Sequence, residues 1–311
     1  MKIFTLTLNP AFDVHARADR FALHKESVAD IISRDAGGKG INISRALSAF
    51  SCENRAYVLL GKENGEEFAA MLDGYGIPHE DFKTEGRIRE NITVHVDGEK
   101  ETRLSFRGAP SSDGDLAAVE QALLSRVSAG DVVTFTGSVP SGMSAARIHD
   151  FLSRLRARGV QLVIDSKSIE REELIDLRPA LIKPNAEEVS AVIGKEVSSL
   201  SECLAGAREL SLAGIGNVIV SFGEEGACLA SSGCVFTANA PKIRAVSTIG
   251  AGDSMIAGFL YAASMGEAAS DCLRYAIAFG TAACLTEGTN PPRKEDVYAL
   301  LPEIAVESFD N

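Results

Sequence analysis

Two common nucleotide-binding signatures are missing from this sequence. It has no G-x-x-x-x-G-K-[ST] segment, which excludes a Walker A site. It also has no G-x-G-x-x-G after an apolar run, which argues against a Rossmann oxidoreductase. No apolar stretch is long enough for a membrane span. The N-terminal apolar run ends at Asn9-Pro10, which fits a buried strand better than a signal peptide.

Positive charge and paired cysteines are also scarce. Acidic residues outnumber basic ones by 43 to 31, and the net charge of −12 repels nucleic acid and anionic membranes. If the substrate is an anion, the positive charge that attracts it must therefore come from a local cluster of Lys and Arg. The six cysteines show no C-x-x-C spacing, which argues against a zinc site. We expect reduced thiols in a cytoplasmic enzyme.

What the sequence does contain is an alternation of short apolar runs and amphipathic helical segments. Apolar residues make up 45% of the 311 residues, enough for a single α/β domain over 1–311. The alternation predicts a mostly parallel sheet covered on both faces, with ligands bound beyond the carboxyl ends of its strands. The predicted strands are Ile3–Leu8, Ala56–Leu60, Val132–Thr136, Leu162–Asp165, Ala180–Lys183 and Val218–Ser221.

Two segments break this alternation because they read as strands without helices between them. They are Ser27–Arg34 and Arg89–Phe106. In the second segment Asp97-Gly98 supplies a hairpin turn, and Lys100–Phe106 forms the return strand. We predict a small antiparallel sheet within about 12–34 and 88–107, which serves as a lid, a dimer surface, or both.

The sharpest chemical signal is Ser247-Thr248-Ile249-Gly250-Ala251-Gly252-Asp253-Ser254, which precedes a helical pattern over Met255–Met265. Glycines at the start of a helix leave free N–H groups that bind anions. A carboxylate there repels phosphate, but it can accept the proton of a hydroxyl that attacks a γ-phosphoryl group. The alternative is an ordinary glycine turn in which Asp253 is the N-cap.

A second glycine cluster, Gly37-Gly38-Lys39-Gly40, precedes a helix that runs to about Phe50. Lys39 adds a positive charge, and Asn42 can either bind hydroxyl groups or cap the helix. Asp13 lies just after the first predicted strand, where its carboxylate can accept hydrogen bonds from sugar hydroxyls. The alternative is a plain loop-to-helix turn.

These clusters, in this order, resemble the ribokinase-like (PfkB) sugar kinases over essentially the whole chain. The resemblance implies a three-layer α/β/α fold with a mostly parallel sheet and a small antiparallel β lid. Within the family the chain is similar to the branch that acts on phosphorylated ketohexoses, which includes 1-phosphofructokinases and tagatose-6-phosphate kinases. The segments that carry this similarity are Thr7–Ala11, Gly37–Gly40, Gly137–Gly142 and Ser247–Met255.

The resemblance also implies roles around the acceptor. Asp253 would be the catalytic base, and the amides of Gly250, Ala251 and Gly252 would form an anion hole. The sugar hydroxyls would be bound by Asp13, Gly37, Gly38 and Asn42. The substrate phosphate would be held by Lys39, Arg89, Arg103 and Ser138, since guanidinium groups suit phosphate. The alternative for the two arginines is solvated side chains on an exposed sheet.

On the nucleotide side, the resemblance implies that Lys183 and Asn185 contact phosphates and that Glu188 holds Mg²⁺ through water. The alternative for Asn185 and Glu188 is a capping box. The remaining nucleotide-binding candidates are Ser221, Gly223, Glu224, Gly226, Thr248 and Thr281. The loop Ser166-Lys167-Ser168 departs from the family pattern and receives no role.

The resemblance implies ATP- and Mg²⁺-dependent phosphorylation of a ketohexose monophosphate by a homodimer that forms through the lid. The first choice of reaction converts fructose 1-phosphate to fructose 1,6-bisphosphate, and tagatose 6-phosphate is the second choice of acceptor. An alternative of a different class is a non-catalytic sugar-phosphate sensor on the same fold. The intact Asp253 and its glycines argue against a sensor.

Overall fold

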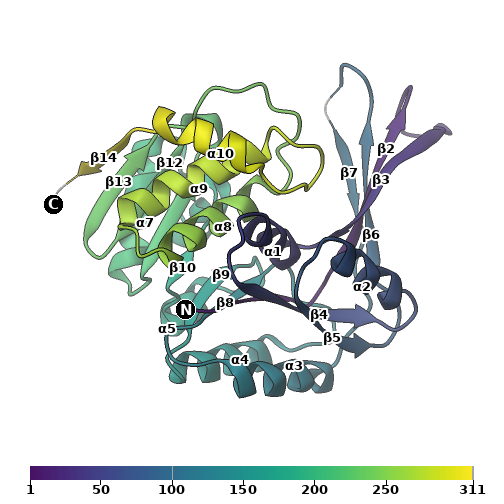
Figure 1. The fold of residues 1–311 in the computed structure, drawn as a ribbon, viewed down its shortest axis with the longest axis horizontal. Helices are drawn as coiled ribbons and strands as arrows, with labels where there is room; N and C mark the ends of the chain where they lie inside the picture. Colours follow the sequence, from purple (N-terminus) through teal and green to yellow (C-terminus); the bar gives the residue numbers. More distant parts are fainter. Residues whose placement is uncertain (100, 310–311) are drawn as a thin grey trace.

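The computed structural model describes residues 1–99 and 101–309. Within them the chain forms a ten-stranded sheet and a four-stranded sheet (Figure 1). The strands of the large sheet, in spatial order, are β14 (Val306–Phe309), β13 (Cys234–Ala238), β12 (Ala227–Ser231), β11 (Asn217–Ser221), β10 (Leu181–Ile182), β9 (Gln161–Asp165), β8 (Val132–Thr136), β1 (Ile3–Thr7), β4 (Asn54–Gly61) and β5 (His79–Thr84). Neighbours from β11 to β5 run parallel, and β12 to β14 pair antiparallel. The predicted mostly parallel sheet is confirmed.

Helices cover both faces of this sheet. One face packs against α3 (Asp113–Arg126), α4 (Ala145–Ala157), α5 (Arg171–Leu177), α6 (Ala186–Ile193) and α7 (Leu200–Leu212). The other packs against α1 (Lys39–Ala49), α2 (Gly65–Gly74), α8 (Ala251–Ser264), α9 (Ala269–Ala283) and α10 (Lys294–Leu300). Strand side chains alternate between the two cores, so that in β8 Val133 and Phe135 face the first and Val132 faces the second. Short 3₁₀ turns lie at Gly223–Glu225 and Leu301–Glu303.

The four-stranded sheet projects from the main body as the lid (Figure 1). Its strands, in spatial order, are β3 (Ala29–Gly37), β2 (Ala11–Ala18), β6 (Arg89–His95) and β7 (Thr102–Ser105). The pairs β2–β3 and β6–β7 are antiparallel, and parallel pairing of β2 with β6 joins them. Lys100, the predicted first residue of the return strand, lies outside the described residues.

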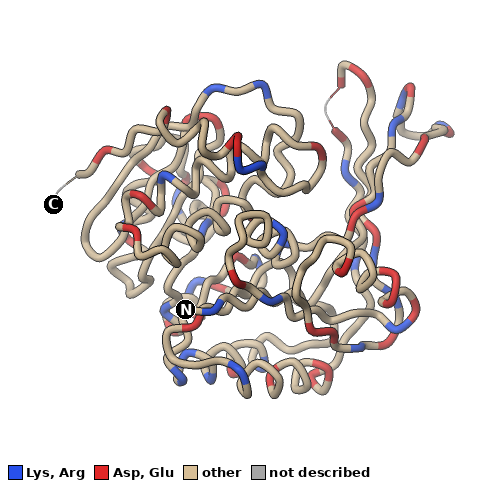
Figure 2. The backbone as a smooth tube through the Cα atoms, in the orientation of Figure 1, with Lys and Arg blue, Asp and Glu red and all other residues tan. Residues whose placement is uncertain are grey.

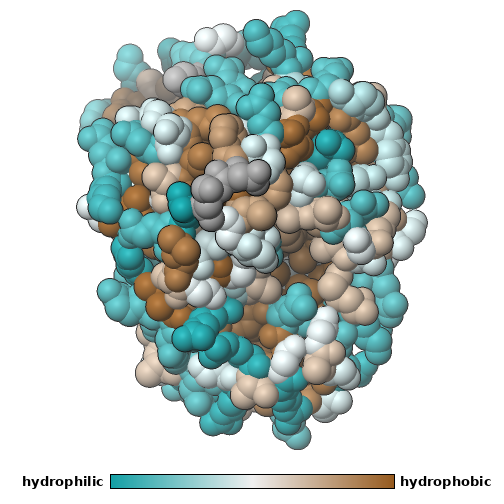
Figure 3. All heavy atoms as spheres, turned by 90° about the vertical axis from the view of Figure 1, so that its left-hand side faces the viewer, coloured by the Kyte–Doolittle hydropathy of each residue, from teal (hydrophilic) through white to brown (hydrophobic). Residues whose placement is uncertain are grey.

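Charged and apolar residues are mixed over the molecular surface. Lys and Arg alternate with Asp and Glu along both the main body and the lid (Figure 2). Figure 3, a view onto the side of β14, shows several separate apolar areas among polar side chains. In the part of the chain that the structure describes, no helix combines the length and apolar character of a bilayer crossing.

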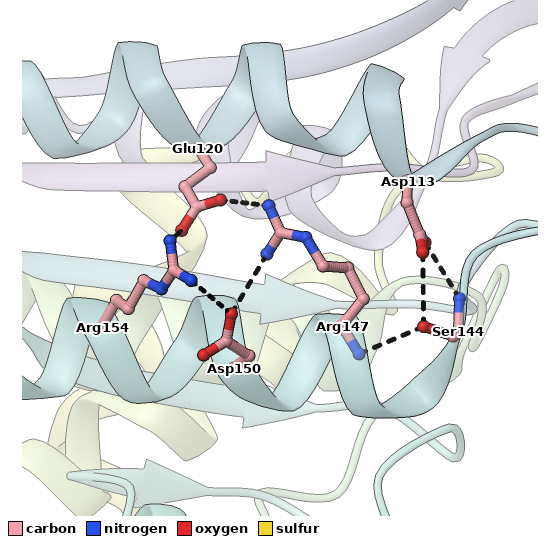
Figure 4. A network of polar contacts seen from close by, with 6 residues as sticks. All are labelled: Asp113, Glu120, Ser144, Arg147, Asp150 and Arg154. Carbon is pink, nitrogen blue, oxygen red and sulfur yellow. Dashed lines mark hydrogen bonds and ion pairs between the residues drawn. The ribbon is translucent and has the colours of Figure 1, made fainter.

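An ion-pair network around the buried Glu120 ties α3 to α4 (Figure 4). Glu120 on α3 is only 4% exposed. Its carboxylate pairs with the guanidinium of Arg147 and, at 3.3 Å, with that of Arg154, both on α4. Asp150 lies between the arginines, 2.8 Å from Arg154. The network holds together two helices that cover the same face of the large sheet.

Candidate active site

A cavity of about 470 Å³ lies between the lid and the carboxyl ends of the central strands. Residues that follow β1, β8, β9 and β10 line it, together with lid strands and the starts of α1 and α8. The predicted site residues that line the cavity are Asp13, Gly38, Lys39, Asn42, Arg89, Arg103, Ser138, Lys183, Asn185, Glu188, Thr248, Gly250, Gly252 and Asp253.

The carboxylate of Asp253 lies at the floor of this cavity. Helix α8 begins after Gly250, whose φ of 80° is left-handed, and Asp253 is the third helical residue. Asp253 is therefore not the N-cap, and that alternative is wrong. The helix also starts earlier than the predicted Met255. The Nδ2 atom of Asn42, from α1, donates a 2.8 Å hydrogen bond to Oδ2 of Asp253.

Burial and neighbouring charges set the protonation of Asp253. Burial raises its pKa to about 6, and the negative charge of Asp165 acts in the same direction. The ammonium groups of Lys39 and Lys183 and the hydrogen bond from Asn42 oppose this rise in pKa. The result is a carboxylate that is ionised at neutral pH but is a stronger base than an exposed aspartate.

Lys39 forms an ion pair with Asp165, and the Nζ to Oδ2 distance is 2.8 Å. Burial alone would lower the pKa of Lys39, but Asp165 and Asp253 outweigh that effect and raise it. Lys39 was predicted to hold the substrate phosphate. In this structure the Lys39 ammonium pairs with Asp165 and is also attracted by the carboxylate of Asp253.

The start of α8 has the form of an anion site. A Cβ atom on Gly252 would lie 3.0 Å from Nζ of Lys183, so glycine at this position gives the ammonium group room against the first turn. Lys183 is only 5% exposed. The N–H of Ala251, which was expected to contribute to the anion hole, donates to the carbonyl of Thr248 at 3.4 Å. A buried cation and a helix N-terminus thus face the same space.

The opposite wall comes from the lid. Asp13 accepts 3.0 Å hydrogen bonds from Nδ2 of Asn91 and from the guanidinium of Arg103. A Cβ atom on Gly37 would lie 2.1 Å from Oδ2 of Asp13, so this glycine makes room for the carboxylate. Arg89 donates to the carbonyls of Phe106 at 2.9 Å and Asn9 at 3.2 Å. The two arginines line the cavity and are not simply solvated.

Asn185 and Glu188 form the capping box of α6. Asn185 Oδ1 accepts from the N–H of Glu188 at 2.8 Å, and Glu188 Oε2 accepts from the N–H of Asn185 at 3.1 Å. The capping interpretation is confirmed, and Glu188 also faces the cavity. Its Oε1 lies 3.5 Å from Nζ of Lys167, in the loop that departs from the family pattern.

Several predicted residues do not line the cavity. Gly37 and Ala251 are not among its lining residues, and Thr281 is buried within α9. The predicted nucleotide loop begins beside the cavity, because Ser221 bridges to Asn185 and donates its N–H to the carbonyl of Pro184 at 3.1 Å. The members of this loop outside the lining are Ser221, Gly223, Glu224 and Gly226.

Sequence reasoning missed several polar residues of the cavity, including Asp165, Thr7 and Thr136. Each is the last residue of a strand, which is the signal that could have identified it. Twelve buried side-chain polar atoms lack a hydrogen-bond partner within residues 1–99 and 101–309, and six of them belong to residues of this cavity. The six are Thr7 Oγ1, Asn42 Oδ1, Arg89 Nε, Asn91 Oδ1, Thr136 Oγ1 and Thr289 Oγ1. Such a concentration is typical of a site that a polar ligand completes.

Comparisons with known proteins find relatives over nearly the whole chain. Two proteins named 1-phosphofructokinase match nearly the whole chain. The one from Vibrio cholerae is 29% identical over 308 residues, covering 99% of this chain and 97% of the relative. The one from Borreliella burgdorferi is 32% identical over 310 residues, covering 99% of both.

A solved structure shares the fold of this chain. Phosphofructokinase-2 from Escherichia coli, solved in complex with substrates and products, matches with a TM-score of 0.91 at 25% identity, over 97% of this chain and 99% of that one. The ribokinase-like fold is thereby confirmed. Residues 11–296 match the pfkB family carbohydrate kinases. This chain therefore belongs to the pfkB family of carbohydrate kinases and is a phosphotransferase.

Proposed function

We propose that this protein transfers the γ-phosphoryl group of ATP to a ketohexose monophosphate, and that its acceptor is fructose 1-phosphate. One observation carries the proposal. The buried carboxylate of Asp253 lines the same cavity as an anion site, formed by the start of α8 and Lys183, and as a lid wall that contains Arg89 and Arg103. A hydroxyl group can therefore meet a phosphoryl group while a second phosphate is held at the lid.

In the proposed reaction, Asp253 accepts the proton of the acceptor hydroxyl as its oxygen attacks the γ-phosphorus. The bond between that phosphorus and the bridging oxygen breaks, and ADP keeps the electron pair. The N-terminus of α8 and the ammonium of Lys183 stabilise the charge on the transferred group. Asn42 orients the base through its 2.8 Å hydrogen bond. A base with a pKa of about 6 matches the weak basicity that a loose transition state needs.

Kinases of this family use ATP, and we propose Mg²⁺ as its partner ion. Among the described residues, no group of three or more His, Cys, Asp or Glu side chains could hold a metal ion directly. This fits Mg²⁺, which keeps several waters and binds mainly to substrate phosphates. Glu188 would hold the ion through water, since it faces the cavity. When bound, the ion would neutralise charge on the nucleotide phosphates.

The choice of a phosphorylated acceptor rests on the charges of the lid. Arg89 and Arg103 lie on adjacent strands, and Nε of Arg89 is buried without a partner. A free sugar offers no charge to these groups, whereas a phosphate ester does. The two relatives named 1-phosphofructokinase favour fructose 1-phosphate among the phosphorylated ketohexoses.

We also propose a homodimer formed through the lid, in the cytoplasm. The exposed large apolar residues on or beside the lid strands are Leu23, Val28, Ile31, Ile32, Leu104 and Phe106. Their gathering on one projecting sheet favours a self-complementary contact. All six cysteines are free thiols, which is compatible with a reducing compartment.

The test is ADP release by the purified protein with ATP and Mg²⁺. Fructose 1-phosphate, tagatose 6-phosphate, fructose 6-phosphate and fructose are compared side by side, with Asp253→Asn as the control. A kcat/KM preference for fructose 1-phosphate that the control loses supports the proposal. Preference for a 6-phosphate keeps the mechanism and changes the acceptor. Turnover of fructose alone, or of nothing, refutes the proposed function.

A further inference from the structure

Asn9 lies between the large sheet and the lid, in the wall of the cavity. It follows β1 and precedes lid strand β2, and its half-buried side chain lines the cavity. The polypeptide therefore passes from the main sheet to the lid at this residue. None of the motifs that predicted the site gave it a role.

Asn9 contacts two of the proposed phosphate ligands, Ser138 and Arg89. Its Nδ2 donates a 2.9 Å hydrogen bond to Oγ of Ser138, in the segment after β8. Its backbone carbonyl accepts a 3.2 Å hydrogen bond from the guanidinium of Arg89, on lid strand β6. Its Oδ1 lies against Gly108, where a Cβ atom would be only 2.2 Å away. One residue thus fixes the spacing between a lid arginine and a main-body hydroxyl.

The direction of these hydrogen bonds determines which hydrogens of Ser138 and Arg89 remain free to bind a phosphate. Because Nδ2 of Asn9 donates to Oγ of Ser138, the single hydroxyl hydrogen of Ser138 is left to donate elsewhere. Arg89 uses Nη1 and Nη2 on backbone carbonyls, and its buried Nε–H has no partner among the described residues. Burial lowers the pKa of Arg89 and the nearby Arg103 acts in the same direction, while the carboxylate of Asp13 partly offsets them. Both ligands therefore offer N–H or O–H donors to an acceptor-only group such as a phosphate.

We propose that Asn9 is a positioning residue that makes the acceptor site selective for a phosphorylated sugar, because it aligns the Ser138 hydroxyl and the Arg89 guanidinium on one phosphate. This inference rests on the proposed function and adds the residue that sets its substrate class. Asn9 acts through its neighbours and need not touch the reacting atoms.

Two substitutions test Asn9: one removes its hydrogen-bond donor, and the other displaces its side chain. Asn9→Asp keeps the shape, but a carboxylate cannot donate to Ser138, which then turns its hydroxyl hydrogen toward residue 9. Gly108→Ala leaves Asn9 in the sequence and displaces its amide, because the new Cβ would collide with Oδ1. Gly108 itself does not line the cavity. The matched control is Gly74→Ala at the end of α2, where an added Cβ meets no atom within 4 Å.

The measurement is steady-state kinetics with the phosphorylated acceptor that the wild-type protein prefers, with KM for the sugar phosphate, KM for ATP and kcat recorded separately. We expect both variants to raise the KM for the sugar phosphate about 10- to 100-fold, the usual effect of losing hydrogen bonds to a charged group. KM for ATP should stay within about twofold, and Gly74→Ala should match the wild type. A merely structural role would instead change kcat or both KM values together.

The outcomes separate the two proposals. If the wild-type protein phosphorylates no ketohexose phosphate, the proposed function fails and this inference fails with it. If the wild type does so but Asn9→Asp and Gly108→Ala keep its KM for the sugar phosphate, Asn9 does not position the phosphate ligands. A rise in that KM in Asn9→Asp alone, with Gly108→Ala folded and unchanged, would also overturn the inference, because displacement of the amide should be sufficient.

Discussion

The ionised form of Asp253 should destabilise the folded protein, so Asp253→Asn should be more stable than the wild type at neutral pH. The pKa of Asp253 rises from 3.8 to about 6 because the side chain is buried. The folded state therefore binds this proton more tightly than the unfolded chain does. Stability from this group is present below pH 3.8 and is lost as the pH rises through 6.

The size of the effect follows from the pKa difference. A shift from 3.8 to about 6 corresponds to about 3 kcal/mol at pH 7, and about half of that remains at pH 5. Asparagine has the shape of the protonated acid, and its Oδ1 can still accept the hydrogen bond from Asn42. The variant should therefore gain about 3 kcal/mol in free energy of unfolding at pH 7 while losing turnover.

Urea unfolding of both proteins at pH 8, 7 and 5 measures this difference. The matched control is Asp296→Asn, because Asp296 is also the third residue of its helix, α10, and is not in the cavity. That control should lose about 0.5 kcal/mol of favourable interaction with the helix dipole. A variant at position 253 that is less stable than the wild type at pH 8 would refute the reasoning. So would a gain that does not shrink between pH 8 and pH 5.

Three further perturbations address other parts of the molecule. Arg147→Ala should lower the free energy of unfolding by about 3 kcal/mol in urea titration, because it removes a partner of buried Glu120. Gly37→Ala should lower kcat/KM for the acceptor about a hundredfold, because its Cβ would displace the Asp13 carboxylate; unchanged kinetics would contradict this. Lys39→Met should move the acid limb of the kcat/KM profile to higher pH, because Lys39 lowers the pKa of the base; a shift to lower pH would count against that base.

Local patterns predicted six strands of the large sheet and placed Asp253 at the start of a helix. The predicted strand Val132–Thr136 has the bounds of β8, since a short run buried on both faces has few alternatives. The glycines beside Asp253 predicted a helix start, and the structure has one. The first turn of that helix was missed because Gly252 is a poor helix former. Packing overrides propensity here: a Cβ on Gly258, in the same helix, would lie 2.5 Å from the carbonyl of Tyr275.

Pairings between distant segments could not be predicted. Lys39 and Asp165 are 126 positions apart, and nothing near either residue indicates its partner. The same holds for Asn42 and Asp253, 211 positions apart. A single sequence indicates that a cation and a carboxylate lie at strand or helix ends, but not which pairs form once the strands are ordered side by side. The pKa of Asp253 depends on those pairs, so its shift required the structure.

The glycine clusters show how local and distant information combine in this fold. Read locally, they predict tight turns in which a backbone approaches an anion. In the structure, two of these glycines also provide space for a side chain from elsewhere, Gly37 for the carboxylate of Asp13 and Gly252 for the ammonium of Lys183. In the proposed reaction the first pair would serve the acceptor and the second the transferred phosphoryl group. A glycine signature of this kind therefore identifies the site only when the charged residue that fills the space is present in the same chain.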